Sequence, residues 1–337
     1  QPLMPAHRLP RLVGRLLVLA AALSLAGCIT INAPLSRTGD PDLHETTISG
    51  SGADKILWLP VTGFISSHPQ SGAFGLTHSA SALTRIERSL AKAAADDAIK
   101  AVILRIDSPG GTVAASDEIY HRITSFHQAT GKPVIASLGG VAASGGYYIA
   151  MAADEVIAQP TTITGSIGVI IVNVNAAGLL DKLGLQDASV TSGEHKDLLS
   201  PLRPPRPDEQ AIVHDVVDAL FQRFVNVVRT SRGARLDHDQ MATITDGRIF
   251  SARAARRLGL VDAVAHRDEV VARVERRIGT DDARLVRYYR GQSAPDTLSA
   301  GATGASHEAS ASLVSRLAES TLTQSATPLY LWRGLAR

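Results

Sequence analysis

The stretch GGVAASGGYYIAMAADEVIA occupies residues 139–158 and decides how the rest of the chain is interpreted. It follows the apolar run PVIASL (133–138), which predicts a buried strand, and its segment 144–153 predicts a short helix. Ser144 therefore stands between small residues at the start of a helix, where backbone N–H groups can hold an oxyanion. A serine at such a position more often caps the helix, so both a nucleophile and an N-cap are open.

Strand and helix patterns alternate on both sides of this stretch. Apolar runs predict further strands at 56–65, 101–106, 156–158 and 167–173. Helical periodicity predicts helices at 79–95, around Ile119 to Phe126 with a stop at Gly131, and at 207–229. The alternation predicts an α/β fold with a mostly parallel sheet and crossover helices. The helix at 207–229 could cover the sheet or form a subunit interface.

Composition excludes several classes of protein. The chain has 337 residues, 34 basic and 32 acidic side chains, a net charge of +2 and 45% apolar residues. These values exclude a disordered polyelectrolyte and argue against a basic nucleic-acid binder. The single cysteine, Cys28, excludes an internal disulfide and a cysteine-based zinc site. We expect no metal and no cofactor.

The N-terminal residues have the layout of an export signal. A basic start precedes the apolar run 16–27, which is too short to span a bilayer. The run ends in LAGC, which resembles the lipobox of bacterial lipoproteins and implies a lipid on Cys28 after removal of residues 1–27. An uncleaved membrane anchor is the alternative. Both predict a membrane-attached catalytic domain outside the cytoplasm, in the bacterial cell envelope on the periplasmic side.

Segment composition predicts the domain organisation. Residues 28–54 are expected to form a lipidated flexible tether and residues 55–290 the catalytic domain. Residues 291–312 have the composition of a low-complexity linker. Residues 313–337 form a C-terminal tail, in which Leu313–Leu322 could be an amphipathic helix and the segment PLYLWRGLAR is too apolar for plain solvent-facing coil.

A serine nucleophile needs a base, and the loop SGEHKD (192–197) offers His195 and Lys196. A lysine can act as a base where burial lowers its pKa from about 10.4 to about 7 or 8, whereas arginine stays charged. The chain contains only six lysines among its 34 basic residues, so a lysine in this loop favours a role that needs titration. The alternative is a solvated Lys196 paired with Glu194 or Asp197.

Five motifs together resemble the bacterial signal peptide peptidase A family, also called protease IV, in its short single-repeat form. They are DSPGGTV (107–113), the stretch 139–158, TTITGSIGVI (161–170), SGEHKD and DGRIFSARAARRLGLVDAV (246–264). The resemblance implies a crotonase/Clp-protease-like spiral of βαβ units with added helices.

The same resemblance implies the site residues. Ser144 would be the nucleophile, Lys196 the general base and Ser166 a hydrogen-bond partner that orients the lysine. The amides of Gly111 and Gly145 would form the oxyanion hole. The implied substrates are membrane-associated apolar peptides such as remnant signal peptides.

The resemblance also implies a ring-shaped homo-oligomer, in which the lysine can reach the serine of a neighbouring subunit. The separation of 52 residues between Ser144 and Lys196 is compatible with pairing within one subunit or between two. Two other functions are weighed beside this serine endopeptidase. One is an acyl-CoA-type crotonase, which would use the same paired-amide oxyanion hole. The other is a catalytically silent crotonase-fold lipoprotein that acts as a scaffold.

Overall fold

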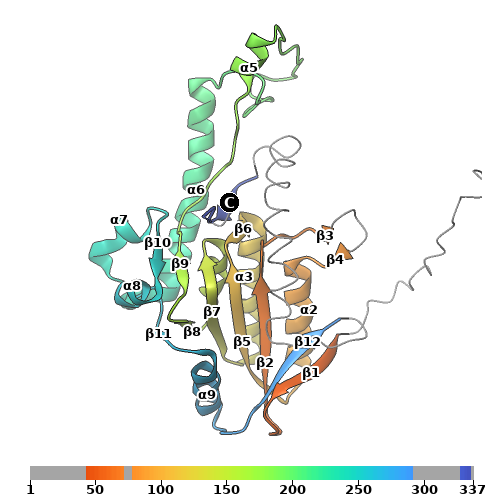
Figure 1. The fold of residues 1–337 in the computed structure, drawn as a ribbon, viewed down its shortest axis with the longest axis vertical. Coiled ribbons are helices and arrows are strands. Elements are labelled where there is room, and N and C mark those ends of the chain that lie inside the picture. Colours follow the sequence, from red (N-terminus) through yellow and green to blue (C-terminus); the bar gives the residue numbers. More distant parts are fainter. Residues whose placement is uncertain (1–42, 72–77, 291–326, 335–337) are drawn as a thin grey trace, which may run out of the picture. The chain divides into compact units, whose positions relative to one another are not determined.

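A mostly parallel sheet of nine strands organises the computed structural model, which describes residues 43–71, 78–290 and 327–334 (Figure 1). Its main strand order is β1-β12-β2-β5-β7-β8-β11, and β9 and β10 continue from β7. The bounds are β1 (His44–Ser49), β2 (Lys55–Thr62), β5 (Ile99–Ser108), β7 (Val134–Ala143), β8 (Glu155–Ala158), β9 (Ile163–Gly165), β10 (Ile249–Ser251), β11 (Ala263–Val264) and β12 (Arg284–Tyr289). Two small sheets pair β3 (Gln70–Ser71) with β4 (His78–Ser79), and β6 (Gly110–Thr112) with β13 (Leu329–Leu331).

Helices cover both faces of the sheet and bury its apolar side chains. One apolar cluster includes side chains of α2 (Ala82–Ala95), α3 (Val113–Thr130), α4 (Gly145–Ala150) and the end of α6 (Pro207–Arg232). A second cluster packs α9 (Arg267–Ile278) against the other face. The remaining helical elements are α5 (Ala177–Lys182), α7 (Met241–Ile244), α8 (Ala252–Arg257) and the 3₁₀ turns Gly233–Arg235 and His238–Gln240.

Strand β7 changes its pairing partner along its length, and this fork in the sheet positions the candidate site. Its first half pairs in parallel with β8, and residues 141–143 pair in parallel with β9. The fork falls at Gly139 and Gly140, and a Cβ at Gly139 would lie 2.8 Å from the Asp107 carboxyl carbon. Only glycine fits at Gly139 without displacing Asp107, which accepts a hydrogen bond from the Val141 amide.

Most predicted elements are present. Helix α3 ends at Gly131, which adopts φ +67° and donates its N–H to the His127 carbonyl. The predicted strand at 167–173 is wrong: among the described residues only Ile170 forms a bridge there, with Leu329 of the tail. Its apolar character therefore reflects contact with the C-terminal segment and not a strand of the main sheet.

Several expectations for the chain ends fall outside the described residues. The expected signal segment, Cys28 and the expected helix at 313–322 all lie there. Strand β1 lies within the segment expected to be a tether, and it pairs antiparallel with β12. No helix in the described ranges is long and apolar enough to cross a membrane.

A buried ion pair anchors the end of α6 to the sheet. Arg232 is buried, and its guanidinium donates two hydrogen bonds of 2.8 Å to the carboxylate of Asp262. That carboxylate also accepts a hydrogen bond of 2.8 Å from the Val156 amide. Burial by itself raises the pKa of Asp262, but the hydrogen bonds from Arg232 and Val156 outweigh it and hold this pKa below its usual range.

We expect Asp262→Asn to lower the free energy of unfolding by about 3–5 kcal/mol at pH 7, because it leaves the Arg232 charge buried without its partner. A lowered carboxyl pKa stabilises the fold above the unfolded-state value of about 3.9, and this contribution is lost as the pH falls through the still lower folded-state value. Urea unfolding should therefore show a smaller difference between wild type and variant at pH 3 than at pH 7. Asp281→Asn, at an exposed position, is the control. An equal difference at both pH values would contradict the prediction.

Candidate active site

Ser144 occupies a strained turn between β7 and α4. Its backbone has φ 53° and ψ −117°, which is uncommon for a residue with a side chain. Its N–H donates to the Gly165 carbonyl and its carbonyl accepts from the Tyr148 amide, both at 2.8 Å. Although Ser144 takes the N-cap position of α4, its side chain makes no capping hydrogen bond. Helix capping therefore does not explain the strained backbone of Ser144, and strain of this kind indicates a chemical role.

Two glycine amides converge beside this turn. A Cβ on Gly145 would lie 3.2 Å from the Gly111 nitrogen, and a Cβ on Gly110 would lie 2.9 Å from the Gly145 nitrogen. Side chains at these positions would also meet other atoms, since a Cβ on Gly111 would lie 2.0 Å from the Ile65 carbonyl oxygen. Glycine is therefore required for the backbone to approach this closely. The Gly111 and Gly145 nitrogens therefore lie close to one another beside the Ser144 turn.

The DSPGG loop is held by a serine whose role the sequence analysis missed. Ser108 is fully buried; its hydroxyl donates to the Gly63 carbonyl at 2.6 Å and accepts from the Gly110 amide at 3.0 Å. Strand pairing adds to this, because the Ile65 amide donates to the Gly110 carbonyl at 2.9 Å. Ser108 therefore positions the loop that carries Gly111. In the sequence, its position between Asp107 and Pro109 of the DSPGG motif could have indicated this positioning role.

Ser166 directly follows strand β9, beside the Ser144 turn. Ala143 of β7 pairs with Gly165 of β9, so the two serines directly follow paired residues. Ser166 also has a positive φ, 51°, and its N–H donates to the Arg248 carbonyl at 2.8 Å. The structure thus brings together four of the predicted residues: Ser144, Ser166, Gly111 and Gly145.

Lys196 is not joined to this group within one chain. It lies in an exposed turn, and no hydrogen bond connects its amine with Ser144 in the described residues. His195, the other candidate base, is also exposed, and its nearest acidic partner is Asp208 at 3.9 Å. Neither side chain is hydrogen-bonded to Ser144 in the described part of the single subunit.

A charged cluster, which we call the Arg203 clamp, fixes the segment that carries Lys196. The Arg203 guanidinium donates to both oxygens of Asp197, at 2.6 and 2.8 Å, and also to Glu209 at the start of α6. Arg206 donates to Glu209 as well, at 2.8 Å. The hydrogen bonds from Arg203 lower the pKa of Asp197 and of Glu209 to about 2. The residue next to Lys196 is therefore held in place and ionised.

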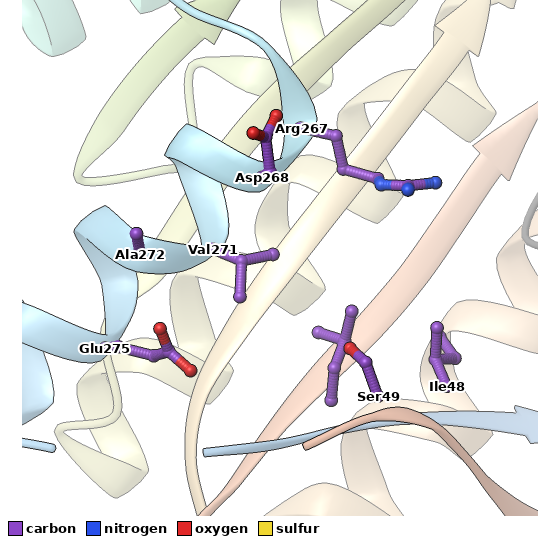
Figure 2. Close-up of a pocket in the computed structure, with 8 residues that line it drawn as sticks. Ile48, Ser49, Arg267, Asp268, Val271, Ala272 and Glu275 are labelled. Atoms are coloured by element: carbon purple, nitrogen blue, oxygen red, sulfur yellow. The ribbon is translucent and has the colours of Figure 1, made fainter. Parts of the chain in front are cut away.

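A hollow of about 290 Å³ elsewhere in the molecule is lined by residues of β1, α9 and β12 (Figure 2). Arg267, Asp268 and Glu275 contribute its charged groups. None of its lining residues belongs to an element that carries a candidate site residue. The chemistry is therefore assigned to the turn at Ser144 and not to this hollow.

Comparisons with known proteins give the family. The family model for peptidase family S49 matches residues 127–281, and the Clp protease model matches residues 76–164. A predicted signal peptide peptidase SppA of Enterococcus faecium is 34% identical over 247 residues, which are 73% of this chain and 70% of that protein. The chain belongs to peptidase family S49, the signal peptide peptidase A family.

Other S49 relatives agree with this assignment. A predicted protease of Synechocystis sp. is 37% identical over 215 residues, covering 64% of this chain and 71% of that protein. Protease 4 of Haemophilus influenzae is 38% identical over 192 residues, covering 56% of this chain and 30% of that protein. Among solved structures, a mutant of the membrane-bound stomatin-specific protease 1510-N aligns over 72% of this chain and all of its own, with 18% identity and a TM-score of 0.46.

Membership settles the broad reaction class. This S49 chain is a serine peptidase with an α/β fold of the Clp protease and crotonase class, as the motifs predicted. The family assignment argues against the acyl-CoA crotonase and the silent scaffold.

Proposed function

We propose that Ser144 is the nucleophile of a Ser/Lys peptidase and that Lys196 of a second copy of the chain is its general base. The observation that carries the proposal is the Ser144 turn, where a hydroxyl free of capping bonds stands beside two converging amides. Ser166 lies at the end of the adjacent strand and supplies a hydroxyl to orient the incoming amine.

The mechanism follows the logic of serine hydrolysis with an amine in the place of imidazole. Neutral Lys196 takes the Ser144 proton, and the Ser144 oxygen adds to the peptide carbonyl. The amides of Gly111 and Gly145 donate to the resulting oxyanion. The ammonium then protonates the leaving amine, and water hydrolyses the acyl-enzyme in a second round. Burial of Lys196 against the partner would supply the desolvation that the neutral amine requires.

The surface around Lys196 supports pairing between subunits. Large apolar side chains of the segment from α5 to the first half of α6 are exposed, among them Leu179, Leu183, Val190 and Val216. Helix α6 fully buries apolar side chains only in its C-terminal part, where Phe224 and Val228 lie. An exposed apolar surface of this kind is typical of an interface. Association through it would cover these side chains and desolvate Lys196, consistent with a ring of identical subunits.

Mixing Ser144→Ala subunits with Lys196→Ala subunits should restore part of the activity that each lacks alone. In a ring formed from equal amounts, about one quarter of the sites join an intact Ser144 to an intact Lys196 of the neighbour. Hydrolysis of a fluorogenic peptide after dissociation and reassociation would measure this. Mixing Ser144→Ala with the double variant Ser144→Ala/Lys196→Ala is the control, which should stay inactive. Hybrid rings, detected by native mass spectrometry, without recovered activity would contradict pairing between subunits.

We further propose that the substrates are apolar peptides at a membrane, including remnant signal peptides, and that a lipid on Cys28 holds the enzyme in the cell envelope. The LAGC motif and the apolar run before it support the anchor. A diacylglycerol on Cys28 would supply two acyl chains, which anchor a protein more stably than one chain does.

A further inference from the structure

Strand β7 contains a two-residue bulge shortly before Ser144. While β5 advances by two residues, from Ile106 to Ser108, its partner β7 advances by four. Gly139 and Gly140, which we call the glycine bulge, are paired with neither neighbouring strand, and they fall where β7 changes its partner from β8 to β9. Extra residues of this kind bend a strand and re-aim the side chains that follow, often beside active sites.

The glycine bulge brings Ser144 level with the loop that carries the candidate oxyanion hole. Beyond the bulge, Ser108 lies opposite Ala142. Two residues further along each chain, Gly110 therefore comes beside Ser144. A Cβ on Gly110 would lie 2.9 Å from the Gly145 nitrogen, which agrees with this register. Without a bulge, the same residues of β7 would carry Ser144 two positions, or about 7 Å, past the loop.

The apolar pattern of β7 does not by itself select the bulge. Side chains of a strand point alternately to the two faces of a sheet, so a slip of one residue exchanges the faces. A slip of two residues returns every side chain to its original face. The bulged and unbulged registers therefore bury the same face of the strand, and contacts at the bulge have to distinguish them.

Thr162 makes the most buried of these contacts. Its side chain is 1% exposed, and its hydroxyl donates to the Gly139 carbonyl at 2.6 Å and accepts from the Gln159 amide at 2.8 Å. Thr162 lies between the end of β8 and the start of β9, so it supplies a partner where no strand does. Since a buried carbonyl without a donor is costly, the Thr162 hydroxyl stabilises the bulged register.

Two side chains of β5 hold the backbone on either side of the glycine bulge. The Asp107 carboxylate accepts a hydrogen bond of 3.1 Å from the Val141 amide, which follows the bulge. The Arg105 guanidinium donates a hydrogen bond of 3.2 Å to the Leu138 carbonyl, which precedes it. Together with Thr162, these side chains give the freed backbone groups of β7 their hydrogen-bond partners.

We propose that Thr162 and Asp107 are positioning residues, which hold the glycine bulge and thereby set the place of Ser144 beside the candidate oxyanion hole. This inference rests on the proposed role of Ser144. Both side chains act through the backbone of β7 and not on the substrate. A displacement of about 1 Å at a reacting group can lower a rate by about 10²-fold. Loosening the bulge should therefore lower kcat while peptide binding stays unchanged.

Thr162→Val tests the hydroxyl, because valine has the same branched shape but neither donates nor accepts a hydrogen bond. We expect kcat for a fluorogenic peptide to fall about tenfold, with KM within about twofold of wild type. Thr162→Ser keeps the hydroxyl and should recover most of kcat. The same peptide, labelled, should bind Ser144→Ala and Ser144→Ala/Thr162→Val equally in fluorescence anisotropy. All measurements are made below the thermal unfolding transition of each variant.

Asp107 is tested in the same way. Asp107→Ala removes the acceptor of the Val141 amide and should lower kcat about tenfold, whereas Asp107→Asn keeps an oxygen there and should recover most of it. Because both residues hold one bulge, Thr162→Val/Asp107→Ala should lower kcat by less than the product of the single effects. Thr124→Val is the matched control: this hydroxyl donates to the Tyr120 carbonyl at 2.9 Å within α3, and kcat should not change.

A fluorophosphonate reports on the nucleophile without a peptide. The serine oxygen bonds to phosphorus, fluoride leaves, and the base takes the serine proton. Labelling of Thr162→Val should be about tenfold slower than labelling of wild type, in proportion to kcat. Labelling of Thr124→Val should proceed at the wild-type rate.

The outcomes separate this proposal from the proposed function. Wild-type kcat or wild-type labelling in folded Thr162→Val would overturn the positioning role, and so would an equal loss in Thr162→Ser. Tenfold weaker peptide binding by Ser144→Ala/Thr162→Val would also overturn it, because the bulge would then shape the peptide site and not the place of the nucleophile. Peptide hydrolysis that persists in Ser144→Ala would instead overturn the proposed nucleophile.

Discussion

Ser144→Ala is expected to lower kcat/KM for peptide hydrolysis by at least about 10³-fold. The substitution removes the oxygen that forms the acyl-enzyme and leaves the amides of Gly111 and Gly145 in place. Residual activity would come from these amides and from binding alone. The free energy of unfolding should change little, because the Ser144 hydroxyl makes no capping bond and alanine meets the same positive φ. Hydrolysis of a fluorogenic peptide and urea unfolding measure the two quantities.

Ser89→Ala is the matched control for this variant. Ser89 is also a buried serine, but it lies in α2 and its hydroxyl donates to the Arg85 carbonyl at 2.8 Å. Its activity should stay close to wild type. If Ser144→Ala and Ser89→Ala hydrolyse the peptide equally, Ser144 is not the nucleophile.

Lys196→Arg should reduce kcat/KM by about 10³-fold or more, although it keeps the positive charge. Arginine cannot give up its proton at working pH, so it cannot accept the proton of Ser144. Hydrolysis of a fluorogenic peptide by wild type and by Lys196→Arg measures the difference.

Lys100→Arg serves as the control because Lys100 is an exposed lysine in β5, outside the segment from α5 to α6. It should keep wild-type activity. Wild-type kinetics in Lys196→Arg would mean that Lys196 supplies charge only, and the base would have to be sought elsewhere.

Local sequence patterns predicted most of the fold. The apolar runs before each glycine-rich loop became β5 and β7, and Gly131 ended α3 with a positive φ. The five motifs also predicted the neighbours Ser144 and Ser166, which follow paired residues of β7 and β9. These features depend on short-range propensity and on the parallel connection rule, both of which can be inferred from the sequence.

Long-range pairing could not be predicted in the same way. The segment 167–173 was expected to join the sheet, but its bridge at Ile170 goes to Leu329, far along the chain. Tyr330 likewise lies in a tail whose apolar character was noted, while its partners Tyr148 and Phe224 come from separate helices. Nothing in the local pattern of either segment specifies the other. The contact that we propose between Lys196 and Ser144 of a second copy could not be predicted either, because no pattern within one copy describes a contact between copies.

The Arg203 clamp has a consequence for the proposed contact between subunits. Association loses translational, rotational and local conformational entropy, and a loop that must be ordered on contact adds to that loss. The clamp already ties Asp197 to Glu209 in the single subunit, and ionisation of both carboxylates persists well below neutral pH. The Lys196 loop therefore reaches the encounter with its backbone already restrained. The proposed interface would then form with a smaller entropy loss than a free loop would impose.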